Sequence, residues 1–224
     1  MIFKSWTESL PDSVEIFGFE PPGRGIRLRE AAFKRIGPLV ESVTAALLPY
    51  LDKPFVLFGH SMGARIVFEI ARNLRRENRP MPRHLFVSGS PAPQIKDEDP
   101  PTYNLPEAEF IDEVRKLNGT PKEVLEHQEL LQLMLPLLRA DFEVVQTYQY
   151  TSERPLECPI TALGGLQDKE VKRQDLEGWQ EQTTGSFTLR MFPGNHFFLH
   201  TDQSLLMRAL SQDLLQIVHS ITAR

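Results

Sequence analysis

The stretch PFVLFGHSMGARIVFEIARNLRR, residues 54–76, decides the fold of this chain. Residues 54–58 are short, apolar and bounded by turn residues, which predicts a buried strand. Residues 64–76 carry apolar side chains at three- and four-residue spacing, which predicts a helix. Between them, GHSMG matches the G-x-S-x-G pattern of a tight strand-to-helix turn with serine at its strained apex. Glycines at 59 and 63 suit such a turn because the helix then packs closely on the strand.

Ser61 is therefore the candidate nucleophile. The turn is expected to lift its hydroxyl above the edge of a sheet and to aim the N–H of Met62, at the helix start, toward a developing oxyanion. His60 is expected to pack beneath the turn rather than take part. The alternative is an ordinary glycine turn capped by a serine.

Strand and helix patterns alternate on both sides of this stretch. Further strands are expected over 14–19 (VEIFGF), 84–87 (HLFV), 160–163 (ITAL) and 187–192 (FTLRMF), and further helices over 39–50, 176–183 and 205–218. Strands joined by helices imply right-handed crossovers and a largely parallel sheet covered on both faces. The predicted fold class is an open α/β sandwich, in a single domain of 224 residues.

The interval from about 94 to 158 contains no strand candidate, and structureless loops of that length are uncommon in compact domains. Helices expected over 108–117, 122–138 and 140–148, separated by NGTP and bent at Pro136, predict an inserted helical lid. Its middle helix is apolar over a wider arc than one packing face requires. Some of its side chains either line an acyl-chain pocket or simply pack on the sheet domain. The candidates for the pocket are Leu130, Met134, Leu137 and Leu138.

A serine nucleophile at neutral pH needs a base, and the base needs an orienting carboxylate. In the chain order serine, acid, histidine, Asp168 follows the strand expected at 160–163 and His196 follows the one expected at 187–192. Both lie beyond the carboxyl ends of strands, where α/β folds place reactive groups. Asp175 and Glu170 are neighbouring alternatives for the acid. The remaining histidines are expected at the surface or at an interface: His84, His127, His200 and His219.

The composition excludes several classes of function. A net charge of −5 without a basic block argues against nucleic-acid binding. The single cysteine, Cys158, cannot form an internal disulfide, which favours a reducing, cytoplasmic compartment. Neither a signal sequence nor a stretch approaching the roughly 20 apolar residues of a membrane span is present, so membrane association is not expected. No Cys/His cluster has zinc-ligand spacing, and the predicted chemistry needs no metal and no cofactor.

Four motifs in order resemble the type II thioesterases of nonribosomal peptide and polyketide assembly lines, with relatives in medium-chain fatty-acid synthesis. They are PGRGIR at 22–27, FGHSMGA at 58–64, LRADFEVV with TYQY at 138–150, and FPGNHFFL at 192–199. The resemblance implies hydrolysis of acyl thioesters from the phosphopantetheine arm of an acyl or peptidyl carrier protein, as editing or release. For Arg24 and Arg27 of the first motif, the alternative is a turn with a structural arginine.

The chain departs from this family at its start, because family members begin with a central strand and a glycine-rich FPYAGG-like loop. Here the chain opens at MIFKSW, which resembles the start of the following helix. The strand apparently missing would lie between those expected at 14–19 and 54–58, and its loop would supply the second oxyanion N–H. An incomplete N-terminus is the expected cause. Two alternatives to a thioesterase stay open: a general carboxylesterase or lipase-like hydrolase, and a catalytically impaired carrier-protein-binding fragment.

Overall fold

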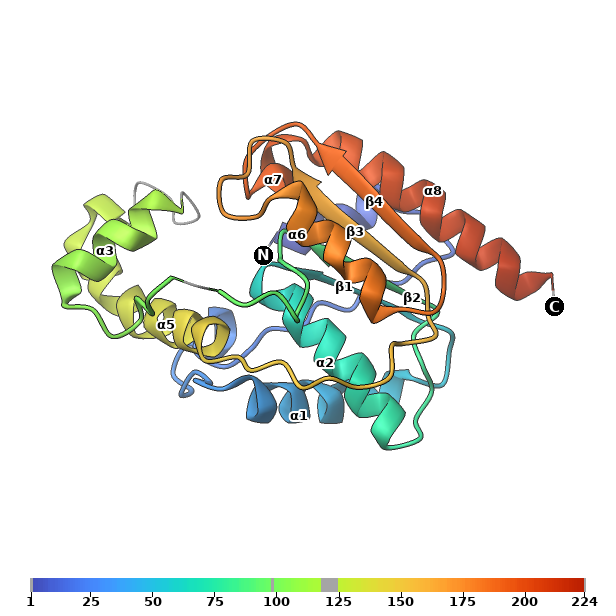
Figure 1. The fold of residues 1–224 in the computed structure, drawn as a ribbon, viewed down its shortest axis with the longest axis horizontal. Helices are drawn as coiled ribbons and strands as arrows, with labels where there is room; N and C mark the ends of the chain where they lie inside the picture. Colours follow the sequence, from blue (N-terminus) through green and yellow to red (C-terminus); the bar gives the residue numbers. More distant parts are fainter. Residues whose placement is uncertain (1, 98, 118–124, 224) are drawn as a thin grey trace.

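A parallel sheet forms the centre of the computed structural model, which describes residues 2–97, 99–117 and 125–223. Four strands lie in the order β1–β2–β3–β4, so that spatial order follows chain order (Figure 1). The pairing is in parallel throughout, with Phe58 opposite Phe86 and Phe86 opposite Thr161. The strands are β1 (Val56–His60), β2 (His84–Ser88), β3 (Ile160–Gly165) and β4 (Phe187–Phe192). The predicted parallel α/β architecture is confirmed.

Helices cover both faces of the sheet, because alternate strand residues point to opposite sides. Leu85 and Val87 of β2 belong to a core under α1 (Ile36–Leu47), α2 (Met62–Arg76) and α6 (Arg173–Glu177). Phe86, between them, packs on the other face with residues of α7 (Phe198–Thr201) and α8 (Gln203–Thr222). The short 3₁₀ helices are η1 (Ile2–Glu8), η2 (Gly25–Arg27), η3 (Leu48–Tyr50) and η4 (Gly178–Gln182).

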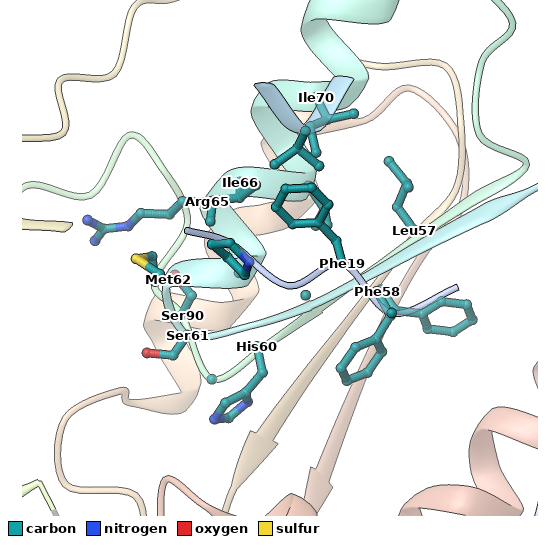
Figure 2. A pocket seen from close by; sticks show the side chains of 18 of the residues that line it. Phe19, Leu57, Phe58, His60, Ser61, Met62, Arg65, Ile66, Ile70 and Ser90 are labelled. Atoms are coloured by element: carbon teal, nitrogen blue, oxygen red, sulfur yellow. The ribbon is translucent and has the colours of Figure 1, made fainter. Parts of the chain in front are cut away.

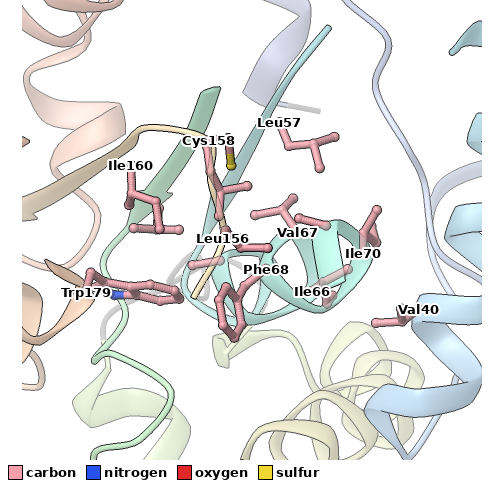
Figure 3. Close-up of a cluster of buried hydrophobic side chains, with 14 of the residues drawn as sticks. Val40, Leu57, Ile66, Val67, Phe68, Ile70, Leu156, Cys158, Ile160 and Trp179 are labelled. Carbon is pink, nitrogen blue, oxygen red and sulfur yellow. The ribbon is translucent and has the colours of Figure 1, made fainter. Parts of the chain in front are cut away.

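The core beside α2 contains the largest buried ring of the molecule (Figure 3). Trp179 is fully buried, meets Phe68 edge-on with ring centroids 5.3 Å apart, and donates its indole N–H to the Ser90 carbonyl. Cys158 lies in the same core as a free thiol, and burial raises its pKa to about 11. The thiol therefore stays protonated and unreactive at neutral pH.

Two helices between β2 and β3 lie apart from the sheet, on the left in Figure 1. They are α3 (Glu107–Lys116) and α5 (Gln128–Gln146), called here the α3/α5 pair, and they share a separate small core around Phe110 and Leu135. The division into two helices over 122–138 and 140–148 is wrong, because α5 runs through the exposed Pro136 as one helix; the bend expected at this proline stays a prediction. Tertiary packing on both sides of the proline offsets the lost hydrogen bond. The NGTP segment lies outside the described residues.

The strand expected at 14–19 is absent, and this prediction is wrong. These residues belong to neither helix nor strand, although Val14 and Ile16 pack against the α8 side of the molecule and Phe19 against the α2 side. A strand requires a neighbouring backbone for its hydrogen bonds. In the described part of the chain, β1 is an edge strand paired only with β2. A cavity of about 2060 Å³ reaches from residues 14–19 along β1 to Ser61.

Candidate active site

The turn between β1 and α2 holds Ser61 in a strained conformation, with φ 54° and ψ −118°. Few residues other than glycine adopt a positive φ, and such strain is found mainly at functional positions. The Ser61 N–H donates to the Ser88 carbonyl of the neighbouring strand at 2.7 Å, which fixes the turn to the sheet. Figure 2 shows Ser61 at the end of β1, with Met62 opening the helix beyond it.

The two glycines of the turn are not equivalent. A Cβ at Gly59 would lie 2.1 Å from the Gly63 carbonyl oxygen, so the close approach of helix to strand requires glycine there. A Cβ at Gly63 would meet nothing within 4 Å. The expectation of small residues on both sides of the serine is therefore strictest at Gly59, while Gly63 has room for a Cβ.

His196 and Asp168 are joined at the carboxyl ends of β4 and β3. His196 Nδ1 lies 2.8 Å from Asp168 Oδ2, and the Asp168 side chain is completely buried. Burial by itself would raise the pKa of Asp168, but the hydrogen bond with His196 and those from the backbone N–H groups of Glu170 and Val171 lower it below its usual value. Asp168 is therefore a carboxylate that orients the imidazole.

The competing acids occupy other positions. Asp175 Oδ2 accepts the backbone N–H of Lys172 at 2.8 Å and so caps the first turn of α6. Glu170 is exposed to solvent. Of the three carboxylates considered, only Asp168 contacts His196.

Ser61, Met62 and His196 line one cavity. Within the described residues no hydrogen bond joins Ser61 to His196; such bonds often tighten only when substrate binds. Because Nδ1 of His196 faces Asp168, Nε2 is the ring nitrogen left for the serine. Met62 is the first residue of α2, so its N–H belongs to the turn whose N–H groups have no acceptor within the helix. It suits the oxyanion role.

His60 lies directly beneath the turn, as expected. Its ring is 5.0 Å from that of His196, and its Nδ1 lies 2.9 Å from Ser88 Oγ. Burial, with a smaller contribution from the charge of His196, lowers the pKa of His60 to about 3. A neutral ring therefore packs against His196, the candidate base. Gly89, which sequence reasoning missed, makes room for it, since a Cβ there would lie 2.6 Å from His60 Cε1.

The pocket candidates of the α3/α5 pair are not brought together. Leu138 lines the cavity that holds Ser61, whereas Leu130 is 42% exposed. Leu137 is buried and Met134 half-buried, and neither is among the residues lining that cavity. Position on α5 explains the difference, since only the turns after Pro136 reach the site. Sequence reasoning missed the later residues that do line the cavity: Asp141, Phe142, Val145 and Gln146.

The two arginines of the PGRGIR motif form ion pairs with carboxylates of this chain. Arg24 Nη2 lies 2.6 Å from Asp141 Oδ1 of α5, a contact 117 residues apart that no local pattern signals. Arg27 pairs with the neighbouring Glu30.

The remaining histidines differ in burial. His84 is half-buried in β2, and its ring stacks on that of Phe86 with centroids 4.4 Å apart, so the surface prediction for it is wrong. His127, His200 and His219 are exposed.

A metal-binding cluster and a membrane-spanning helix are both absent from residues 2–97, 99–117 and 125–223. In these ranges no cluster of His, Cys, Asp and Glu side chains could hold a metal ion. None of the helices in them has the length and apolar character needed to cross a membrane.

The model of the Thioesterase domain family matches residues 1–214. Over 212 residues the chain is 42% identical to the gramicidin S biosynthesis protein GrsT of Aneurinibacillus migulanus, an alignment covering 95% of this chain and 83% of that protein. It is 36% identical over 202 residues to the medium-chain S-acyl fatty acid synthase thioesterase of Rattus norvegicus, covering 88% of this chain and 76% of that one. Among solved structures, the RedJ thioesterase of the prodiginine pathway in Streptomyces coelicolor superposes with a TM-score of 0.87 at 38% identity, over 94% of this chain and 80% of that one. With its parallel sheet and its serine at the strand-to-helix turn, the chain belongs to the thioesterase family of α/β-hydrolase fold, and its activity is thioester hydrolysis.

Proposed function

We propose that this chain hydrolyses acyl thioesters carried on the phosphopantetheine arm of acyl or peptidyl carrier proteins, as editing or release in an assembly line. The observation that carries the proposal is the shared cavity, which is lined by the strained Ser61 and by an imidazole held by a buried carboxylate. The relatives of this chain include a gramicidin S biosynthesis protein and a fatty acid synthase thioesterase.

Each proposed residue has one role in the reaction. Ser61 Oγ attacks the thioester carbonyl carbon while His196 Nε2 takes its proton, and the resulting oxyanion accepts the Met62 N–H. Collapse expels the thiolate, which takes the proton from His196 and leaves an acyl-Ser61. Water then attacks the acyl group, giving its proton to His196. The acid is released when that proton returns to Ser61.

The α3/α5 pair is proposed to act as the lid of this single 224-residue domain, with Leu138 on its substrate side. Leu138 lines the Ser61 cavity, and the pair is joined to the sheet domain through Arg24 and Asp141. A cytoplasmic location is proposed from the single reduced cysteine, Cys158, which lies buried in the core.

The test compares one acyl group in two linkages, as an acyl-pantetheine thioester and as the matched oxygen ester. We expect the thioester to be hydrolysed faster than the oxygen ester. We expect the Ser61→Ala variant to hydrolyse neither. An equal or faster rate on the oxygen ester supports a general carboxylesterase instead. Failure of Ser61 to react with a fluorophosphonate probe supports a noncatalytic carrier-protein binder.

A further inference from the structure

Arg65 is a charged residue beside the nucleophile that the proposed reaction does not use. It lies on the first turn of α2, one turn or about 5.4 Å beyond Ser61, and it lines the same cavity. Figure 2 shows its side chain extending on the Met62 side of the helix, away from Leu57 and Phe58. One nitrogen, Nη1, donates to the Val145 carbonyl at 2.8 Å.

Arg65 forms no close ion pair within the described residues, although the charge of Asp97, which lines the same cavity, acts on it at longer range. Its guanidinium lies 5.4 Å from the centre of the Tyr148 ring, and no carboxylate in the described ranges forms an ion pair with it. Its Nε is buried with no hydrogen-bond partner among the described residues. Burial also lowers the pKa of Arg65, which reports the cost of desolvating the charge. Arg72, two turns along the same helix, is buried too, but it pairs with Glu69 and Glu153. Buried charges are ordinarily paired in this way.

A second arginine brings more positive charge to the same place. Arg24 reaches α5 at Asp141, one turn before Val145, so both guanidinium groups lie against the same face of α5. The Nε of Arg24 is likewise buried and unpartnered among the described residues. Asp141 is the one carboxylate paired there in the described part of the chain, and burial raises its pKa. Among the described residues, this corner of the cavity therefore holds two guanidinium groups and one directly paired carboxylate, with the Asp97 carboxylate acting on Arg65 at longer range.

We propose that Arg65 is the centre of an anion-binding subsite, which selects acyl groups bearing a carboxylate a few bonds from the thioester carbonyl. The inference rests on the proposed role of Ser61. One helical turn separates Arg65 from the reacting serine, which matches the reach of a short dicarboxylic acyl chain such as glutaryl. The phosphate of the pantetheine arm offers the same oxyanion chemistry, but many more bonds separate it from the thioester carbonyl. The charge on a guanidinium that lines the cavity is what such a carboxylate would neutralise.

The main experiment measures a ratio of kcat/KM on two N-acetylcysteamine thioesters, which carry no phosphate. One bears glutaryl and the other 5-methylhexanoyl, an uncharged group of similar shape. Arg65→Gln removes the charge and keeps a polar amide on a side chain two bonds shorter. We expect the glutaryl preference to fall about ten- to a hundred-fold, as is usual for a lost hydrogen bond to a charged group. Arg76→Gln, an exposed arginine on the same helix, is the matched control and leaves the ratio unchanged.

Other results overturn the proposal. If Arg65→Gln lowers kcat/KM equally on the glutaryl and 5-methylhexanoyl thioesters, Arg65 only anchors α2 to α5. A third comparison uses 5-methylhexanoyl on phosphopantetheine: a loss confined to that substrate assigns Arg65 to the phosphate and excludes the acyl carboxylate.

Calorimetric binding of free glutarate gives a readout that does not depend on turnover. We expect glutarate to bind the wild-type chain more tightly than the Arg65→Gln variant. If no thioester is hydrolysed but this difference persists, the proposed function fails while the subsite stands. A different outcome separates the two proposals the other way. If thioesters are hydrolysed, but glutarate binds neither protein and Arg65→Gln leaves the kcat/KM ratio of the two thioesters unchanged, the subsite fails while the proposed function stands.

Discussion

Asp168 and Asp175 lie seven residues apart after the same strand, and their local backbone separates their roles. Asp168→Asn is expected to lower kcat/KM by about 10⁴-fold, because an amide favours the wrong imidazole tautomer, with a smaller loss than Ser61→Ala. Asp175→Asn is the matched control and should only weaken the start of α6 by about 1 kcal/mol. Thioester hydrolysis and thermal unfolding of the three variants check this prediction. A greater kinetic loss in Asp175→Asn would reverse the assignment.

His84 makes stability depend on pH far from the candidate active site. Burial, and to a smaller extent the charge of Arg190, lowers its pKa from 6.5 to about 4. Below pH 6.5 the unfolded chain takes up a proton that folded His84 does not, so stability falls as pH drops toward 4. His84→Gln should make this fall smaller by about 1–2 kcal/mol, allowing for partial exposure. Urea unfolding at pH 7 and pH 4.5 measures the effect, with exposed His219→Gln as control. An equal loss of unfolding free energy between pH 7 and pH 4.5 in the unmodified chain and in both variants would contradict the prediction.

At the scale of elements, an ionic network ties residues 148–155 to α2. Arg72 is 3% exposed and contacts Glu69 and Glu153 at 2.7 Å each, as well as the Thr151 carbonyl at 2.5 Å. Tyr148 also donates its hydroxyl to Glu69. These contacts anchor the chain where it leaves α5 and returns to the sheet, so they help to hold the α3/α5 pair over the cavity.

Removing Arg72 takes the most buried cation from Glu69 and Glu153, which then keep only the more exposed Arg75 and Arg76. Arg72→Met is expected to lower the free energy of unfolding by about 3 kcal/mol, because Glu69 and Glu153 keep their charge and lose their main partner. Arg76→Met, at a half-exposed position of the same network, should cost less than about 1 kcal/mol. Denaturant unfolding of both variants tests the difference. A cost of Arg72→Met no larger than that of Arg76→Met would show that the network adds little stability.

At the scale of the whole molecule, the unpaired edge of β1 is the main structural weakness. Apolar side chains line the cavity along this edge, and β1 pairs only with β2 in the described sheet. Unpaired strand edges leave backbone groups unsatisfied and recruit other chains. An extended segment of alternating apolar residues fused ahead of residue 1 is therefore expected to raise Tm and to reduce self-association.

A fusion of equal length made of glycine and serine is the control for this prediction. Thermal unfolding and sedimentation compare the two fusions with the unmodified chain, and hydrolysis rates show whether the added segment also supplies an oxyanion donor. Equal Tm values for both fusions would mean that the edge of β1 does not accept a strand.

The sequence by itself determined the elements whose signals are local. The apolar run at 54–58, the glycine and serine of the turn and the three-to-four spacing of 64–76 predicted β1, the turn and α2 within two residues of their bounds. Chain order and the strand ends made Asp168 and His196 candidates, since the carboxyl ends of adjacent parallel strands meet at one edge of the sheet, but they left Asp175 and Glu170 open as the acid.

Only the tertiary structure decided the features that depend on a distant neighbour. Residues 14–19 have the pattern of a strand but no adjacent backbone to pair with, and α5 continues through Pro136 because packing outweighs local propensity. Leu130 and Leu138 look alike in the sequence, yet only Leu138 faces the cavity. The contacts of Arg24 with Asp141 and of Arg65 with Val145 join positions 117 and 80 residues apart. Short-range periodicity carries no information about such contacts, because it reports which residues share a face and not what lies opposite that face.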